Sequence, residues 1–298
     1  MAHAYRVLDS DYPRSLRELR APPDPLFVRG TLPRGRGVAI VGTRDCSDGA
    51  AAYAHRLATR LAEQGVVVYS GGAVGIDAAA HRGALEAGGI TVAVVATGLD
   101  QCYPPGHAQL YEQIVREGGA LVSAFAPDQK AHHATFHFRN GVLAALAEAT
   151  VVVQAPLHSG ARSTAAHARR LGRHLLVVPA APWDPKGSGN LIELALGGHL
   201  LASDAAVLAL FGIVAAGPPR AARPPRAPSA GERQDPQLLL PPACQRVFEA
   251  IGAVPLHVDD LCVRTGLSTP LVQEALLTLT LQTVLVEGPA GCYRRATY

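Results

Sequence analysis

Residues 66–81, VVVYSGGAVGIDAAAH, constrain the fold of this chain more than any other stretch. An apolar run ends at Ser70 and leads directly into a glycine cluster, which opens an alanine-rich helix pattern. Glycine has no Cβ atom, so Gly71, Gly72 and Gly75 let an anion approach the backbone. The amides of the first helical turn and the helix dipole then favour a phosphate here. An ordinary strand-to-helix connection also uses glycine, so both interpretations stay open.

A second turn of the same kind occurs earlier in the chain. Residues 38–41 are apolar and are followed by Gly42-Thr43-Arg44, and Ser47 then suits the N-cap of a helix that runs to residue 64. The carboxyl ends of parallel strands meet at one edge of a doubly wound sheet, where ligands usually bind. We therefore expect Arg44 and the glycine cluster to lie at the same edge.

Apolar runs recur through residue 179, with helix patterns between most of them. They predict strands at 38–41, 66–69, 91–96, 120–125, 150–155 and 174–179. This succession predicts an α/β fold with a Rossmann-like, doubly wound, mainly parallel sheet over residues 37–212. The proline-punctuated N-terminal segment, 1–36, is too short for a domain of its own.

The composition changes after the predicted sheet. Residues 213–237 are rich in proline and arginine and indicate an extended linker. A small C-terminal domain follows at 238–298, with helix patterns and then two short strands joined by a turn, which is typical of a winged helix. The helices are predicted at 241–252, 258–265 and 269–281.

The last of these helices would be the recognition helix of the motif. Val272, Ala275, Leu276 and Leu279 form its inner face, whereas its outer positions carry no arginine or lysine. Docking into a major groove normally needs phosphate neutralisation. Contact with a protein is therefore expected at least as much as contact with duplex DNA.

The composition excludes several classes of protein. The five cysteines are scattered and form no Cys-x-x-Cys pair, so neither a disulfide framework nor a zinc site is predicted. No apolar run reaches the length of a membrane span, and the N-terminus lacks the apolar core of a signal peptide. We expect a cytoplasmic protein without membrane contact. A net charge of +3 does not by itself indicate a nucleic-acid partner.

The run from 132 to 140, HHATFHFRN, gathers imidazoles, two phenylalanines, an arginine and an amide. Phe136 and Phe138 offer ring faces to unpaired bases, Arg139 offers a cation to phosphate, and Asn140 offers an amide to a base edge. This mixture suits single-stranded nucleic acid. The competing interpretation places both rings in the core and the histidines on the surface. The histidine spacing fits no common zinc pattern, so no metal is expected.

A third anion-suited turn follows the fifth predicted strand. Ser159, Gly160, Arg162 and Ser163 precede a predicted helix at 165–170. Serine here also suits a plain helix cap, so the functional interpretation depends on the turn reaching the same sheet edge.

Two absences narrow the choice further. The chain has no G-x-x-x-x-G-K-[ST] loop, and Ser70 stands where a dinucleotide-binding fold would place an acid for the ribose. No serine, histidine and acid set is recognisable either. We expect no catalysis and no cofactor.

Five motifs together resemble the bacterial DNA-processing protein A family, also called Smf, and the resemblance covers nearly the whole chain. They are IVGTR at 40–44, SGGAVGIDAAAH at 70–81, GLDQCYP at 98–104, FHFRN at 136–140 and SGARSTA at 159–165. The resemblance implies a homodimer that binds incoming single-stranded DNA during natural transformation, protects it and helps load a RecA-type recombinase. It also allows a single-strand-binding protein as a further partner.

Site residues follow from the same resemblance. Arg44 and the glycine turn would hold phosphates, His133 would occupy a basic position, Phe136 would stack on a base, and Arg139 with Asn140 would complete the pocket. The chain departs from many relatives by having Val74 instead of arginine and His137 instead of proline. Because an imidazole gains charge below neutral pH, His133 predicts tighter binding at pH 6 than at pH 8.

Two alternatives remain open. A phosphoribohydrolase of the lysine-decarboxylase-like family would share this kind of sheet, but its P-G-G-x-G-T motif and following glutamate are missing. The second alternative is a nucleotide-sensing regulatory adaptor, in which the winged helix would contact duplex DNA or a protein.

Overall fold

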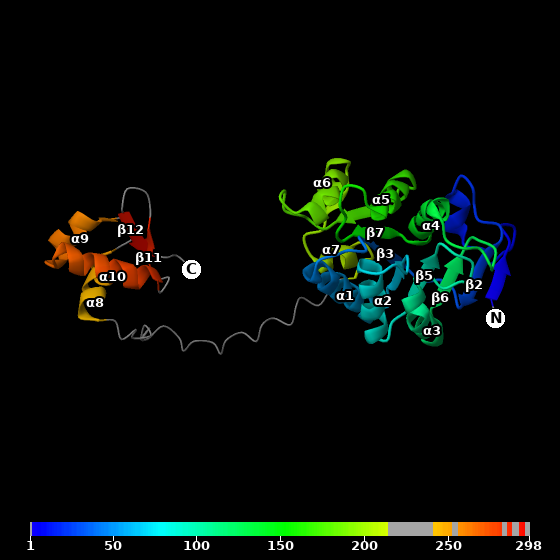
Figure 1. Cartoon of the computed structure of the whole chain (residues 1–298), viewed down its shortest axis with the longest axis horizontal. Helices are drawn as coiled ribbons and strands as arrows, with labels where there is room; N and C mark the ends of the chain where they lie inside the picture. The colour runs from blue at the N-terminus through cyan, green and yellow to red at the C-terminus, as the bar shows by residue number, and fades with distance from the viewer. Residues whose placement is uncertain (1, 214–240, 252–255, 282–284, 288–291, 296–298) are drawn as a thin grey trace. The chain divides into compact units, whose positions relative to one another are not determined.

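The computed structural model describes residues 2–213, 241–251, 256–281, 285–287 and 292–295. The chain divides into two compact units, Met1–Arg220 and Ala221–Tyr298, which Figure 1 draws together. Residues 214–237 of the predicted linker lie outside the described residues. Among the described helices, none combines the length and the apolar character that crossing a bilayer requires.

The larger unit is built on a nine-stranded sheet with the order β1-β2-β6-β5-β4-β3-β7-β8-β9. All pairs from β6 through β9 are parallel. These strands are β3 (Gly37–Val41), β4 (Val67–Ser70), β5 (Thr91–Val95), β6 (Ala120–Ser123), β7 (Ala149–Val152), β8 (His174–Val177) and β9 (His199–Leu200). The six strands predicted from apolar runs are all present, and the mainly parallel sheet is confirmed.

The N-terminal segment belongs to the same sheet. β1 (Ala2–Tyr5) pairs antiparallel with β2 (Leu26–Gly30), and β2 pairs antiparallel with β6. Between them a short 3₁₀ helix, η1 (Arg14–Glu18), buries Leu16 completely. The segment therefore extends one edge of the sheet.

Helices cover both faces of the sheet, as Figure 1 shows. The alternation of β3 explains this, because Val38 and Ile40 pack against one set of helices while Ala39 and Val41 pack against the other. On the first face lie α1 (Asp48–Glu63), α2 (Ile76–Glu86), α3 (Ala108–Arg116) and α7 (Asp204–Ala209). On the second lie α4 (His133–Leu146), α5 (Gly160–Arg170), α6 (Ser188–Ala195) and η1. The doubly wound fold is thus confirmed.

The order of the strands creates one switch point. From β3 the chain proceeds through β4, β5 and β6 on one side, and then returns to build β7, β8 and β9 on the other. The segments that leave β3 and β7 therefore diverge at their carboxyl ends, which is where open α/β sheets bind ligands. They are joined there by the amide of Thr43, which donates to the carbonyl of Gln154 at 2.7 Å.

The smaller unit is a winged helix. Its helices are α8 (Pro242–Ala250), α9 (Val258–Thr265) and α10 (Thr269–Leu281), and its sheet has the order β10 (Leu256–His257), β12 (Cys292–Arg295), β11 (Leu285–Glu287). Gly266, at φ +66°, ends α9 in the left-handed region that glycine favours. The predicted inner face of α10 is buried in full, at Val272, Ala275, Leu276 and Leu279.

Candidate functional site

A groove of about 340 Å³ lies at the switch point. It is lined by residues 41–45 at the end of β3 and after it, by Ala73 and Asp77, by one face of α4 and by the turn before α5. These segments are far apart in the sequence, and the parallel sheet brings their ends to one edge. Six predicted site residues meet in this groove: Arg44, Phe136, Arg139, Asn140, Ser159 and Gly160.

Arg44 is the exposed cation of the groove. Its guanidinium carbon lies 4.9 Å from the ring centroid of Phe136 and 6.0 Å from that of Tyr103. Among the described residues, no carboxylate forms an ion pair with it. A cation held over aromatic faces keeps its N–H donors free at the edge of the planar group. Arg44 can therefore bind an incoming anion without first breaking an ion pair.

Tyr103 and Phe136 form an edge-to-face pair with centroids 5.7 Å apart. Tyr103 is 42% exposed, so part of its ring is available for stacking. Tyr103 was not among the predicted site residues. The signal that could have found it is its place in the GLDQCYP motif, directly after the β5 loop, at the same sheet edge as the other motifs.

The first turn of α4 fixes Phe136. The hydroxyl of Thr135 accepts from the amide of His132 at 3.0 Å and so satisfies the start of the helix. One turn later, Arg139 and Asn140 point inward. Arg139 donates from Nη1 to the carbonyl of Val94 at 2.9 Å, and Asn140 donates to the carbonyl of Gly160 at 3.2 Å.

The prediction for Arg139 needs correction. It was expected to meet phosphate, but its side chain is buried beneath the glycine turn, where it faces Asp77. Burial raises the pKa of Asp77, and Arg139 acts in the opposite direction by favouring the carboxylate. Arg139 thus lines the floor of the groove as part of a buried charge pair.

The glycine turn also differs from its prediction, because the protein fills it. The carboxylate of Asp77 lies at the start of α2 and accepts from the backbone amides of Ala73 and Gly71. Asp77 therefore holds the position in which a phosphate was expected. The hydroxyl of Ser70, another predicted contact, is fully buried and donates to the carbonyl of Ile40 at 2.6 Å.

The three glycines are required by the protein's own atoms. A Cβ atom would lie 1.8 Å from Arg139 Nη1 at Gly71, 2.5 Å from the Tyr111 hydroxyl at Gly72 and 2.5 Å from the Thr43 carbonyl at Gly75. None of the three lines the groove. The turn reaches the groove at Ala73 instead, and Asp77 of α2 lines the groove as well.

Three turns were predicted to suit an anion. At the turn before α5, the first residue of the helix itself lines the groove. Ser159 is the N-cap of α5, and its hydroxyl accepts from the amide of Ala161 at 3.3 Å. Ser159 and Gly160 both line the groove. The positive end of the helix dipole therefore faces the same space as Arg44.

Arg162 and Ser163 were predicted in the same site, but the structure turns both away from it. Nε of Arg162 donates to Glu193 at 2.8 Å, and Glu193 is only 1% exposed. Arg169 pairs with the other oxygen of that carboxylate. The hydroxyl of Ser163 lies 3.1 Å from Nδ1 of His137. A helix turns 100° per residue, so neighbours on α5 face different surroundings.

His133 and Phe138 line a second groove, of about 910 Å³, between η1, α4 and α5. Phe138 is partly exposed and packs edge-to-face on Phe125. His167 lies in the same groove, and burial, reinforced by Arg170 and His137, lowers its pKa to about 4. In the described part of the chain, no three His, Cys, Asp or Glu side chains gather as metal ligands would.

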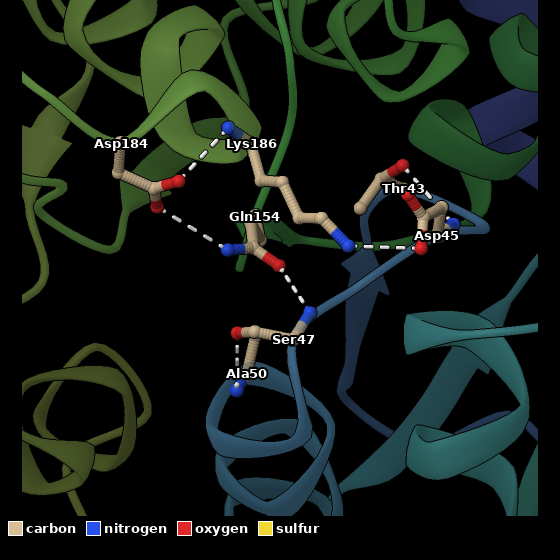
Figure 2. A network of polar contacts seen from close by, with 7 residues as sticks. All are labelled: Thr43, Asp45, Ser47, Ala50, Gln154, Asp184 and Lys186. Carbon is tan, nitrogen blue, oxygen red and sulfur yellow. Dashed lines mark hydrogen bonds and ion pairs between the residues drawn. The ribbon is translucent and has the colours of Figure 1, made fainter.

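A polar network holds the loop that carries Arg44 (Figure 2). The side chain of Gln154 accepts from the amide of Ser47 at 2.8 Å and donates to Asp184 at 3.4 Å. The ammonium of Lys186 lies 2.9 Å from Asp45. The loops after β3, β7 and β8 are thereby tied together. Sequence reasoning missed Gln154 and Lys186, although Lys186 is one of only two lysines in the chain.

The fold and the groove define an α/β protein with an exposed cation–aromatic site at its switch point and a winged helix in the same chain. Residues 3–211 match the family model of DNA recombination-mediator protein A, and residues 219–291 match the DprA winged helix domain. The chain belongs to the DNA recombination-mediator protein A family, known as DprA or Smf.

Curated relatives agree with this assignment. Protein Smf of Synechocystis is 30% identical over 96% of this chain and 78% of its own length. A putative DNA processing protein DprA of Mycobacterium tuberculosis is 38% identical over 86% of this chain and 62% of its own length.

Solved structures of the family share the fold. DNA processing protein A of Streptococcus pneumoniae has a TM-score of 0.65 at 34% identity, covering 70% of this chain and 73% of that one. The Helicobacter pylori protein, whose structure is described as giving insight into a unique single-stranded DNA binding mode, has a TM-score of 0.62 at 26% identity. It covers 71% of this chain and 95% of that one.

Proposed function

We propose that this chain binds single-stranded DNA in the groove at the switch point and acts as a recombination mediator. The observation that carries the proposal is the exposed guanidinium of Arg44 over the ring of Phe136, at the edge where this fold binds ligands. The single-stranded DNA binding described for the Helicobacter pylori relative supports it.

The chemistry of the groove favours a single strand over a duplex. Tyr103 and Phe136 offer ring faces and edges that stack on unpaired bases, which a duplex hides within its own stack. Arg44 and the start of α5 supply two positive features for the phosphates. A groove of about 340 Å³ also lies in the range of small-molecule sites, which suits a single nucleotide of a strand and not a double helix.

The charges beside Arg44 also favour the binding of a phosphate. Asp45 lies beside Arg44 in the chain and would repel a phosphate if it were unpaired. Lys186 neutralises it by an ion pair at 2.9 Å. The charge of Arg44 is therefore not cancelled by its neighbour.

The wider role follows from family membership. We infer a homodimer that delivers the strand to a RecA-type recombinase during transformation and performs no catalysis of its own. The absence of the P-G-G-x-G-T motif and of its following glutamate argues against the nucleotide-hydrolase alternative.

Fluorescence anisotropy tests the binding step. A labelled oligo-dT and its duplex are titrated with the native chain and with a double variant, Arg44→Ala with Phe136→Ala, across a salt series. We expect a salt-sensitive preference for the single strand that the double variant loses. Equal affinity for strand and duplex would refute the proposal. Release of free base from AMP would favour the hydrolase.

A further inference from the structure

We propose that Trp183 is a second stacking platform for the single strand, beyond the groove that holds Arg44. The inference rests on the proposed function and extends it, because it gives the strand a direction across the sheet edge. It also assigns a nucleobase as the partner of a residue that the groove does not use.

Trp183 is the chain's sole tryptophan, and 84% of it is exposed. An indole is among the largest apolar side chains and is normally packed over most of its surface. No ring or cation among the described residues packs on it. An indole with this much exposed surface is available to stack on a flat ligand.

The loop that carries Trp183 is held in place. The next residue, Asp184, receives hydrogen bonds from the side chain of Gln154 at 3.4 Å and from the amide of Lys186 at 2.9 Å. The ammonium of Lys186 reaches Asp45 beside the groove (Figure 2). Pro182 further restricts the backbone on the other side of the indole. The backbone on both sides of Trp183 is therefore held in place by the protein's own contacts.

The sheet brings the loop of Trp183 and the loop of Arg44 to one edge. β3, β7 and β8 are consecutive parallel neighbours, so the loops that leave them lie at the same edge. Strands are spaced by about 4.8 Å, which separates the ends of β3 and β8 by about 10 Å. A stacked strand advances about 3.4 Å per nucleotide, so a strand needs about four nucleotides or more to reach from the end of β3 to the end of β8, and Trp183 lies six residues beyond Val177, the last residue of β8. The ion pair of Lys186 with Asp45 ties the β8 loop to the β3 loop across this distance.

The surroundings of Trp183 favour a base over a protein partner. Protein interfaces bury an aromatic anchor within a cluster of other apolar groups. In the loop 178–187, Trp183 is the only large exposed hydrophobic residue, and Asp184 and Lys186 follow it closely. An isolated ring beside a cation is the arrangement that sequence-independent strand binding uses.

The sole tryptophan makes the test direct, because fluorescence excited at the red edge of tryptophan absorption, where the eight tyrosines absorb little, reports on Trp183. The full-length protein is titrated with oligo-dT of 3, 6, 9 and 15 nucleotides. We expect the shortest strand to bind without quenching and the longer strands to quench the indole. Trp183→Ala should weaken binding of the 15-mer about tenfold and leave the 3-mer unchanged, while Trp183→Phe keeps most of the affinity. The salt slope should not change, since no charge is removed.

Leu196→Ala serves as the matched control, because Leu196 is another exposed apolar side chain, at the end of α6. If the Trp183→Ala variant binds the 15-mer as tightly as the native chain does, this inference is overturned and the proposed function is left intact. A native chain that binds no single strand overturns both. Unchanged DNA affinity combined with loss of self-association or of recombinase loading identifies Trp183 as a protein contact and also overturns the inference.

Discussion

The guanidinium carbon of Arg44 lies 4.9 Å above the ring of Phe136, although 91 residues separate the two in the chain. Arg44 follows the end of β3, and Phe136 lies in the first turn of α4. Each is held by its own loop or cap, so the pair needs no ligand to form. Such preorganisation reduces the entropy lost when a ligand binds.

Replacing Arg44 by alanine should lower the affinity for oligo-dT about tenfold or more, because a charge-assisted contact to phosphate is lost. It should also reduce the slope of log affinity against log salt by about 0.7. Arg56→Ala is the control, since Arg56 is also an exposed arginine over a ring, at 5.1 Å from the centroid of Tyr53, but lies outside the groove. Equal losses in both variants would contradict a specific role for Arg44.

Arg162→Ala should affect stability and leave binding intact. The variant leaves Glu193, a nearly fully buried carboxylate, with Arg169 as its one remaining cation. We expect the free energy of unfolding to fall by about 1–3 kcal/mol in urea titrations. The salt slope for oligo-dT should equal that of the native chain. If the slope of log affinity against log salt were smaller than that of the native chain by the contribution of one phosphate contact, Arg162 would instead leave Glu193 and bind phosphate.

Gly71→Ala should destabilise the protein, because the new Cβ atom would overlap Nη1 of Arg139 at 1.8 Å. Displacing a buried guanidinium costs about 1–3 kcal/mol by the general scale for overpacking. Gly49→Ala is the matched control. Gly49 lies in the first turn of α1 with open space around it, and alanine there should stabilise by about 0.5 kcal/mol. Urea midpoints of the two variants should shift in opposite directions.

His81 should make the fold sensitive to acid. The hydroxyl of Thr91 donates to the carbonyl of Val68, so it accepts from Nδ1 of His81 at 2.8 Å, which leaves Nε2 unprotonated. Complete burial, with smaller contributions from nearby cations, lowers the pKa of His81 to about 3. A histidine in the unfolded chain titrates near 6.5. Between these values the unfolded state binds one more proton than the folded state, so stability falls as the pH decreases.

The expected loss from His81 is up to about 1.4 kcal/mol per pH unit below pH 6.5. Urea titrations at pH 7.5, 6.0 and 5.0 should therefore show a steeper decline for the native chain than for His81→Gln. His167 contributes in the same direction and remains in both proteins. Parallel pH dependences would mean that the imidazole accepts a proton within the fold.

The core of the fold could be predicted from the sequence because its signals are local. Buried parallel strands are continuous apolar runs, and the helices between them show apolar faces. The pairing of β1 and β2 was not predicted. Most positions of β1 are exposed, so neither a continuous apolar run nor an alternating pattern marks it.

The site was predictable only in part. Strand ends identify residues such as Arg44 and Ser159, because parallel topology brings those ends together. Which side of a helix turn faces the groove depends on tertiary packing. Glu193 orients Arg162 from 31 residues away, and no local pattern reveals that partner. The same holds for Arg139, whose burial depends on the glycine turn above it.

Asp77 has a consequence for the molecules that surround the protein in a cell. A fold of this class usually has one strong phosphate-binding site at the turn between a strand and the next helix, and free nucleotides would then compete for it. In this protein the carboxylate of Asp77 binds the backbone amide at the corresponding turn. A mononucleotide can then contact only Arg44 and the start of α5, whereas a polymer makes several contacts at once, and such contacts multiply through effective concentration. We therefore expect the edge of the sheet to favour a polymer over a mononucleotide, and the nucleotide pool to be a poor inhibitor.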